Sequence, residues 1–264
     1  MDTRNSAEPL LLRRDEAGVA WLTLNRPAQR NALSIDLMAA LQAALEATAS
    51  EPANKVVVIA GAGPAFCAGH DLRELRADPS RPFYERTFRD CSRLMQTIMA
   101  LPKPVIARVH GIATAAGCQL VATCDLAVAA ETARFATPGV NIGLFCSTPM
   151  VALTRAVHRK AAMEMLLTGD LVDAARAREL GLVNRVVPEA TLDAEVTTLA
   201  RQIAGKSALT VKTGKEAFYR QAELPLADAY AYASEVMTRN MLARDAEEGI
   251  DAFLQKRPPT WEDR

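Results

Sequence analysis

Two glycine-rich segments carry the residue types best suited to hold negative charge. One runs from Gly61 to Leu72 (GAGPAFCAGHDL) and the other from Gly111 to Leu120 (GIATAAGCQL). Small residues let backbone N–H groups point at a ligand, and a following helix adds the positive end of its dipole. If the two loops converge, they form a two-donor oxyanion hole. Glycine-rich loops often only turn the chain, so the motif alone leaves both interpretations open.

Other binding chemistries are not indicated. Neither loop matches the GxGxxG dinucleotide fingerprint or the GxxxxGK[ST] phosphate loop, so nucleotide binding of those types is not predicted. The cysteines form an odd set without a CxxC pair, which predicts buried free thiols and neither disulfides nor a zinc site. These are Cys67, Cys91, Cys118, Cys124 and Cys146. We therefore expect no bound metal and no separate cofactor.

The charge balance and hydropathy narrow the class of protein. The 264 residues include 31 basic and 31 acidic side chains, so the net charge is zero, and 50% of the residues are apolar. This composition argues against disorder and against a nucleic-acid partner. No apolar run approaches the ~18 residues of a membrane span. The first nine residues lack the apolar region of a secretory signal, and we expect a cytoplasmic protein.

The elements that would position the two loops follow an alternating pattern. Strands are expected at 18–24, 55–60, 105–109 and 126–130, with helices between them, and the apolar runs at 55–60 and 105–109 are typical of buried strands. Ser34 and Asp71 are expected to cap helices that follow them, as is Ser147 or Thr148 before a helix through 150–156. The alternation predicts an α/β core with crossover connections.

The pattern becomes helical after about residue 187. We expect a core over residues 1–200, with 1–9 disordered, and a helical region over 201–264 that packs on the core or on another subunit. Its apolar positions are Leu209, Val211, Ala217, Phe218, Tyr230, Val236, Met237 and Met241.

Several segments together resemble the crotonase superfamily, the enoyl-CoA hydratase/isomerase fold. They are LNRPAQRNALS (24–34), IAGAGPAFCAGHDL (59–72), HGIATAAGCQLVATCDLAVA (110–129), LTRAVHRKAAMEMLLTGD (153–170) and DAARARELGLVNRVVP (173–188). They occur in the family's order and span nearly the whole chain. The resemblance implies a spiral of ββα turns with a C-terminal helical domain. The runs ATPGVNIGLFCSTP and AAGCQL resemble one branch more closely, the enoyl-CoA hydratase domain-containing protein 3 type.

The resemblance also implies a site for an acyl-CoA thioester. The thioester oxygen would lie between the backbone amides of His70 and Ala116, which would stabilise an enolate. Coenzyme A, as part of the substrate, would be held by residues of both loops and of the C-terminal region. The implied binding residues are Arg26, Ala68, Asp71, Leu72, Gly117, Phe253 and Lys256. The family further implies a homotrimer or a dimer of trimers.

Two positions depart from the hydratase pattern of the family. Its two catalytic glutamates correspond here to Gln119 and Gly139. Glutamine exchanges no proton near neutral pH, and glycine has no side chain, so two factors of typically ~10²–10⁴ in rate would be lost. The His70 side chain is a candidate substitute, because its ordinary pKa is in the useful range.

Three interpretations of function therefore stay open. The first is a lyase of fatty acid metabolism that resembles enoyl-CoA hydratase, with non-standard proton handling. The second is a decarboxylase or thioesterase acting on acyl-CoA, for which the AGHDL run gives a resemblance to the decarboxylase branch. The third is a non-catalytic protein that binds acyl-CoA.

Overall fold

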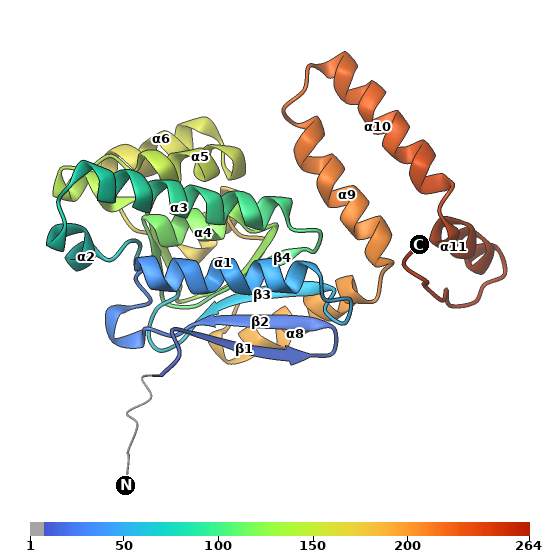
Figure 1. Ribbon diagram of the computed structural model, residues 1–264, viewed down its shortest axis with the longest axis horizontal. Helices are drawn as coiled ribbons and strands as arrows, with labels where there is room; N and C mark the ends of the chain where they lie inside the picture. The colour runs from blue at the N-terminus through green and yellow to red at the C-terminus, as the bar shows by residue number, and fades with distance from the viewer. Residues whose placement is uncertain (1–7) are drawn as a thin grey trace, which may run out of the picture.

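The computed structural model describes residues 8–264 and is built around a six-stranded sheet (Figure 1). The strand order is β1-β2-β3-β4-β6-β9, and β1 alone pairs antiparallel. The strands are β1 (Leu11–Glu16), β2 (Val19–Leu24), β3 (Val56–Gly61), β4 (Val105–Val109), β6 (Leu126–Ala130) and β9 (Arg185–Val187). The expectation that residues 1–9 are disordered lies outside the described residues, except for Glu8 and Pro9.

A second, smaller sheet of three short strands lies beside the first. Its order is β5-β7-β8, formed by β5 (Ile112–Thr114), β7 (Arg134–Ala136) and β8 (Val172–Asp173). The chain alternates between the two sheets and then enters a helix, as in β4, β5 and α4 (Ala116–Thr123). The expected α/β fold is confirmed, and the strands of the large sheet are mostly parallel.

Helices cover both faces of the large sheet, which explains its continuous apolar strands. All six residues of β3 are buried. On one face, α1 (Ile35–Ala49), α3 (Arg81–Ala100) and α4 enclose the larger core (Figure 1). On the other, α8 (Leu192–Ala204) covers a smaller core that includes Val58 and Ile106. The remaining helical segments of the core are η1 (Pro27–Gln29), α2 (Leu72–Ala77), η2 (Pro138–Ile142), α5 (Ser147–Ala156), α6 (Arg159–Thr168), α7 (Ala174–Glu179) and η3 (Glu189–Thr191).

Local capping chemistry explains where two of these helices begin. The Ser34 side chain accepts a hydrogen bond from the Leu37 amide, and Asp71 accepts from the amides of Arg73 and Glu74, so both predicted caps are confirmed. The predicted cap at Ser147 or Thr148 is wrong. Helix α5 already includes Ser147, whose amide is bonded to the Phe145 carbonyl at 2.7 Å, because the chain turns tightly before it.

Three helices at the C-terminal end project away from the sheet (Figure 1). They are α9 (Ala208–Gln221), α10 (Leu226–Met241) and α11 (Arg244–Leu254). A buried ion pair docks α9 on the core, because Lys215 Nζ lies 2.7 Å from the Asp125 carboxylate, which also accepts from the Tyr219 hydroxyl at 2.8 Å.

Much of the apolar surface of these helices is uncovered in one chain. Of the apolar positions expected to pack, Val236 is buried, whereas others are more than half exposed. The exposed ones include Phe218, Tyr230, Met237 and Met241, together with Leu226, Leu242, Phe253 and Leu254.

Candidate functional site

The two glycine-rich loops lie against each other at the carboxyl ends of β3 and β4. The Cys67 amide donates to the Ile112 carbonyl at 3.1 Å, and the Thr114 amide donates to the Cys67 carbonyl at 3.0 Å. Glycine is required for this approach. A Cβ atom at Gly117 would stand 2.1 Å from the Cys67 carbonyl oxygen, and one at Gly69 would stand 2.9 Å from the Ala115 Cβ. The expected convergence of the loops is present.

Convergence brings two unpartnered amides to one place. Within residues 8–264, neither the His70 nor the Ala116 backbone N–H donates a hydrogen bond to a protein acceptor. Ala116 is the first residue of α4, where a helix has free N–H groups and positive dipole charge. Ala115, just before it, has φ of 50°, a left-handed conformation that is unfavourable for alanine. The strain is found where the chain turns to present the Ala116 amide.

A buried asparagine supports the first loop from beneath. Asn31 donates to the carbonyls of Ala62 and Ala65, at 2.8 and 2.7 Å, and accepts from the Arg26 amide at 2.8 Å. Asn31 stands within the run LNRPAQRNALS, yet sequence reasoning gave it no role. A polar residue three positions before the helix cap at Ser34 was the available signal.

The predicted binding residues Arg26 and Asp71 hold each other. The Arg26 guanidinium donates to the Asp71 carboxylate at 2.8 Å and to the Ala32 carbonyl at 2.6 Å. Hydrogen bonds from Arg26 and from two amides of α2 hold the pKa of Asp71 below its usual value, against the opposing effect of burial. The pair thus ties the end of the first loop to the segment after β2.

A cavity of about 600 Å³ opens beside the two amides. The first loop contributes Ala68 and His70, and the second contributes Ala115 and Ala116. The rest of its wall comes from α2, from α3 and from the segment 138–149 that leads into α5. The predicted site residue Leu72 lines it, whereas Gly117 lies behind the wall against Cys67. Sequence reasoning missed Leu75, Phe88 and Phe145, which have no motif and meet only in the fold.

The His70 side chain is a poor proton acceptor in this setting. Both ring nitrogens are closed off from solvent and have no hydrogen-bond partner among residues 8–264. The ring stands edge-on to Phe88, with centroids 5.5 Å apart. Burial lowers the pKa of His70 to about 4, so the imidazole is neutral near pH 7 and a weaker base than a free histidine.

The two positions that correspond to the glutamates of the family differ in how much room they leave for a side chain. Gln119 is buried on α4, and its Oε1 has no partner in the described part of the chain. At Gly139 a Cβ atom would stand 2.6 Å from the Leu144 carbonyl oxygen and 2.9 Å from Cys146 Sγ. The Leu144 amide donates back to the Gly139 carbonyl at 2.9 Å. The turn therefore occupies the space that a side chain at 139 would need.

The structure does not bring Phe253 and Lys256 to this cavity within one chain. Phe253 belongs to α11 and is 83% exposed, and Lys256 follows that helix. Figure 1 shows α11 at the opposite end of the molecule from α2.

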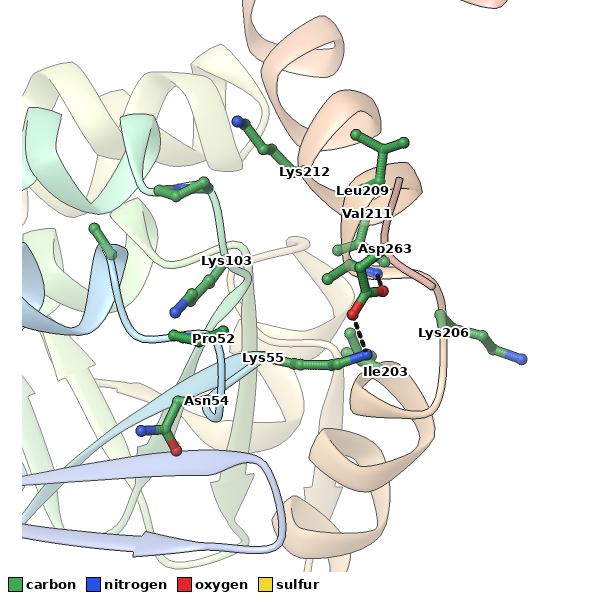
Figure 2. Close-up of a pocket in the computed structure, with 13 residues that line it drawn as sticks. Pro52, Asn54, Lys55, Lys103, Ile203, Lys206, Leu209, Val211, Lys212 and Asp263 are labelled. Atoms are coloured by element: carbon green, nitrogen blue, oxygen red, sulfur yellow. Dashed lines mark hydrogen bonds and ion pairs between the residues drawn. The ribbon is translucent and has the colours of Figure 1, made fainter. Parts of the chain in front are cut away.

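A second cavity, of about 270 Å³, lies near the amino ends of β3 and β4 and is bordered by lysines (Figure 2). Lys55 and Lys103 precede β3 and β4, whereas ligand sites of parallel sheets lie at the carboxyl ends of strands. Two of the charges are already engaged. Lys55 Nζ lies 2.9 Å from the Asp263 carboxylate, and Lys103 donates to the Thr48 and Glu51 carbonyls at the end of α1. This cavity therefore lies at the boundary between the core and the C-terminal helices.

Residues 8–264 contain neither a metal-binding cluster nor a membrane-spanning helix. No group of three or more His, Cys, Asp or Glu side chains is placed to hold a metal ion there. No helix in this range is both long and apolar enough to cross a membrane. All five cysteines are free and buried.

Comparisons with known proteins assign the family. Residues 14–264 match the enoyl-CoA hydratase/isomerase family. The enoyl-CoA hydratase domain-containing protein 3, mitochondrial, of Xenopus laevis is 48% identical over 96% of this chain and 86% of that protein. A crystal structure titled enoyl-CoA hydratase from Mycobacterium smegmatis has a TM-score of 0.94 and 56% identity, covering 96% of this chain and 99% of that one. The crystal structure of human enoyl Coenzyme A hydratase domain-containing protein 3 has a TM-score of 0.93 and 47% identity, covering 96% and 100%.

The names of these relatives contradict the expected cytoplasmic location. Five relatives that are 45–49% identical are named as mitochondrial proteins. The expectation was wrong in its reasoning, because a missing apolar region argues only against a secretory signal, whereas mitochondrial targeting segments are amphipathic and arginine-rich. Fold, site geometry and comparisons agree that this chain belongs to the enoyl-CoA hydratase/isomerase family of the crotonase superfamily, as a protein of the enoyl-CoA hydratase domain-containing protein 3 type.

Proposed function

We propose that the chain binds an acyl-CoA thioester in the 600 Å³ cavity and stabilises its enolate with the amides of His70 and Ala116. One observation carries the proposal: two unpartnered N–H groups, from loops far apart in sequence, meet at the wall of one apolar cavity. When a bond at Cα breaks, with the proton passing to water or the carboxylate leaving as CO₂, the electron pair of that bond is delocalised onto the thioester oxygen. Fixed N–H dipoles in a site that excludes water stabilise that charge without reorganising.

The same two loops would bind coenzyme A. Ala68 and Leu72 flank the amides, and Arg26 and Asp71 hold the segment in place through their ion pair. The ion pair leaves these two residues a positioning role, since the guanidinium is already neutralised. Phe253 and Lys256 would contribute from a neighbouring subunit, because α11 lies far from the cavity of its own chain (Figure 1).

Efficient hydration of an enoyl thioester is not supported. Hydration needs a group that delivers a proton and one that activates water. Gln119 cannot exchange a proton near neutral pH, Gly139 has no side chain, and burial makes His70 a weak base. No cofactor is proposed, because coenzyme A enters as part of the substrate.

Loss of CO₂ is a second candidate reaction, favoured by the same missing groups. In a malonyl-type thioester the bond between C2 and the carboxylate breaks, its electrons form the enolate, CO₂ leaves, and water later protonates C2. This step needs the two amides and no protein base. Thioester hydrolysis and binding without catalysis are the remaining alternatives.

We further propose that the chain assembles as a homotrimer or a dimer of trimers. The apolar side chains of α9 to α11 that are more than half exposed make a surface unusual for a monomer. A monomer in light scattering would refute this proposal.

A panel of thioesters tests the function. Purified protein is assayed with crotonyl-CoA, malonyl-CoA and saturated acyl-CoA, and binding is measured by calorimetry on the same samples. Binding of acyl thioesters with slow or absent hydration supports the proposal. Rapid hydration of crotonyl-CoA by the native chain would contradict the account of the missing glutamates, and absence of any thioester binding would refute the site itself.

A further inference from the structure

The cavity beside the two amides is neutral and mostly apolar. Helix α2 contributes Leu72 and Leu75, α3 contributes Phe88, and the segment before α5 contributes Leu144 and Phe145. Among residues 8–264, no lysine, arginine, aspartate or glutamate lines it. The polar side chains in its wall, such as Asn141, Ser147 and Thr148, are uncharged.

Its one titratable ring, that of His70, also behaves as an apolar surface. Both ring nitrogens are closed off from solvent, and the ring stands edge-on to Phe88, which also lines the cavity. The lowered pKa of about 4 keeps this ring uncharged under physiological conditions. A free carboxylate on the acyl group, as in a malonyl-type thioester, would meet no cation among the described residues of this wall, and burying an unpaired charge is costly. The wall therefore weighs against the decarboxylase alternative.

The cavity is also larger than a short acyl group needs. Its volume of about 600 Å³ lies within the range of pockets that enclose drug-sized ligands. Leu144 and Phe145 at its wall are 55% and 42% exposed, so apolar surface remains to be covered by a ligand. A four-carbon chain next to the amides would leave much of that surface in water.

We propose that this cavity binds the hydrocarbon chain of a medium-length acyl thioester, about as long as an octanoyl group, in preference to short or carboxylated acyl groups. The inference rests on the proposed acyl-CoA site and adds the class of acyl group. Each methylene that leaves water for an apolar wall contributes about a fourfold gain in affinity. Affinity therefore increases with chain length until the cavity is filled.

The test is a calorimetric series with coenzyme A, butyryl-, hexanoyl-, octanoyl- and malonyl-CoA, all below their micelle concentrations. We expect octanoyl-CoA to bind about 250-fold more tightly than butyryl-CoA, because four methylene groups are added and each contributes about fourfold. We expect malonyl-CoA to bind no more tightly than butyryl-CoA. Equal affinity across the saturated series, or tightest binding of malonyl-CoA, would overturn the inference. If no thioester binds better than coenzyme A alone, the proposed function fails as well.

Two variants assign the effect to this cavity. Leu75→Lys puts a charge in the path of the chain, and we expect it to reduce octanoyl-CoA affinity at least tenfold while butyryl-CoA affinity changes little. Leu75→Ala is the second variant, should the lysine disturb folding, and should weaken octanoyl-CoA binding more than butyryl-CoA binding. Leu12→Lys is the matched control, since Leu12 is a 41% exposed leucine of β1 and does not line this cavity. Equal losses in Leu75→Lys and Leu12→Lys would contradict the assignment.

Discussion

The lack of room for a side chain at position 139 can be tested by adding one methyl group there. In Gly139→Ala, the new Cβ would stand 2.6 Å from the Leu144 carbonyl oxygen and 2.9 Å from Cys146 Sγ, well inside normal contact distances. Backbone conformation is not the obstacle, because Gly139 is not among the glycines with positive φ. The cost comes from moving the 144–146 turn, which the hydrogen bond from the Leu144 amide to the Gly139 carbonyl holds in place.

The expected loss follows from two opposing contributions. Overpacking a site that cannot relax costs about 1–3 kcal/mol. Replacing glycine by alanine offsets about 0.4–1 kcal/mol of this loss, because alanine reduces the conformational entropy of the unfolded chain. We expect Gly139→Ala to reduce the free energy of unfolding by about 1–2 kcal/mol, and urea unfolding at fixed protein concentration measures it.

Gly214→Ala is the matched control for this substitution. Gly214 lies in the interior of α9, and a Cβ there would meet nothing within 4 Å. The same change should stabilise that helix by about 0.5–1 kcal/mol. A Gly139→Ala protein as stable as the native one would refute the reasoning. So would efficient hydration of crotonyl-CoA by the double variant Gln119→Glu, Gly139→Glu, which the packing predicts to be inactive.

Three further predictions concern the strained turn, the buried ion pair and the buried imidazole. Ala115→Gly should raise stability by about 1 kcal/mol in thermal denaturation, because it relieves φ of 50°, and an unchanged Tm would contradict the strain. Asp125→Ala should cost about 3–5 kcal/mol in urea unfolding, since it leaves Lys215 buried without its partner, and a loss below about 1 kcal/mol would contradict this. The pKa of His70 is about 4 in the folded protein, below its unfolded value of 6.5. The neutral ring therefore contributes fully to stability above pH 6.5, and this contribution is lost as pH falls toward 4. As pH falls through that window, the free energy of unfolding of the native protein should decrease by about 1.4 kcal/mol per pH unit more than that of His70→Phe. Parallel dependence of the two unfolding free energies on pH would refute this prediction.

Elements with a strong local signal could be predicted from sequence. The strands at 105–109 and 126–130 were predicted with the bounds that the structure has, because continuous apolar runs between helices are typical of buried parallel strands. The caps at Ser34 and Asp71 are equally local. Strands β5, β7 and β8 were missed because they have only two or three residues, too few for a periodic pattern.

Only the part of the candidate site that lies on the two glycine-rich loops could be predicted. The amides of His70 and Ala116 were named only through the resemblance to the family, and their approach depends on the pairing of Cys67 with Ala113, which has no local signature. The distance between Phe253 and the cavity was equally hidden, because it depends on how α9 leaves the core. Packing also turned His70 from a candidate base into a neutral part of the wall.

A crystal structure with bound octanoyl-CoA tests the central claim most directly. The account predicts the thioester oxygen within ~2.7–3.1 Å of both the His70 and the Ala116 amide nitrogens. It also predicts the acyl chain between α2 and the 138–149 segment. A thioester oxygen bound away from these amides, or coenzyme A seated in the lysine-bordered cavity of Figure 2, would contradict it.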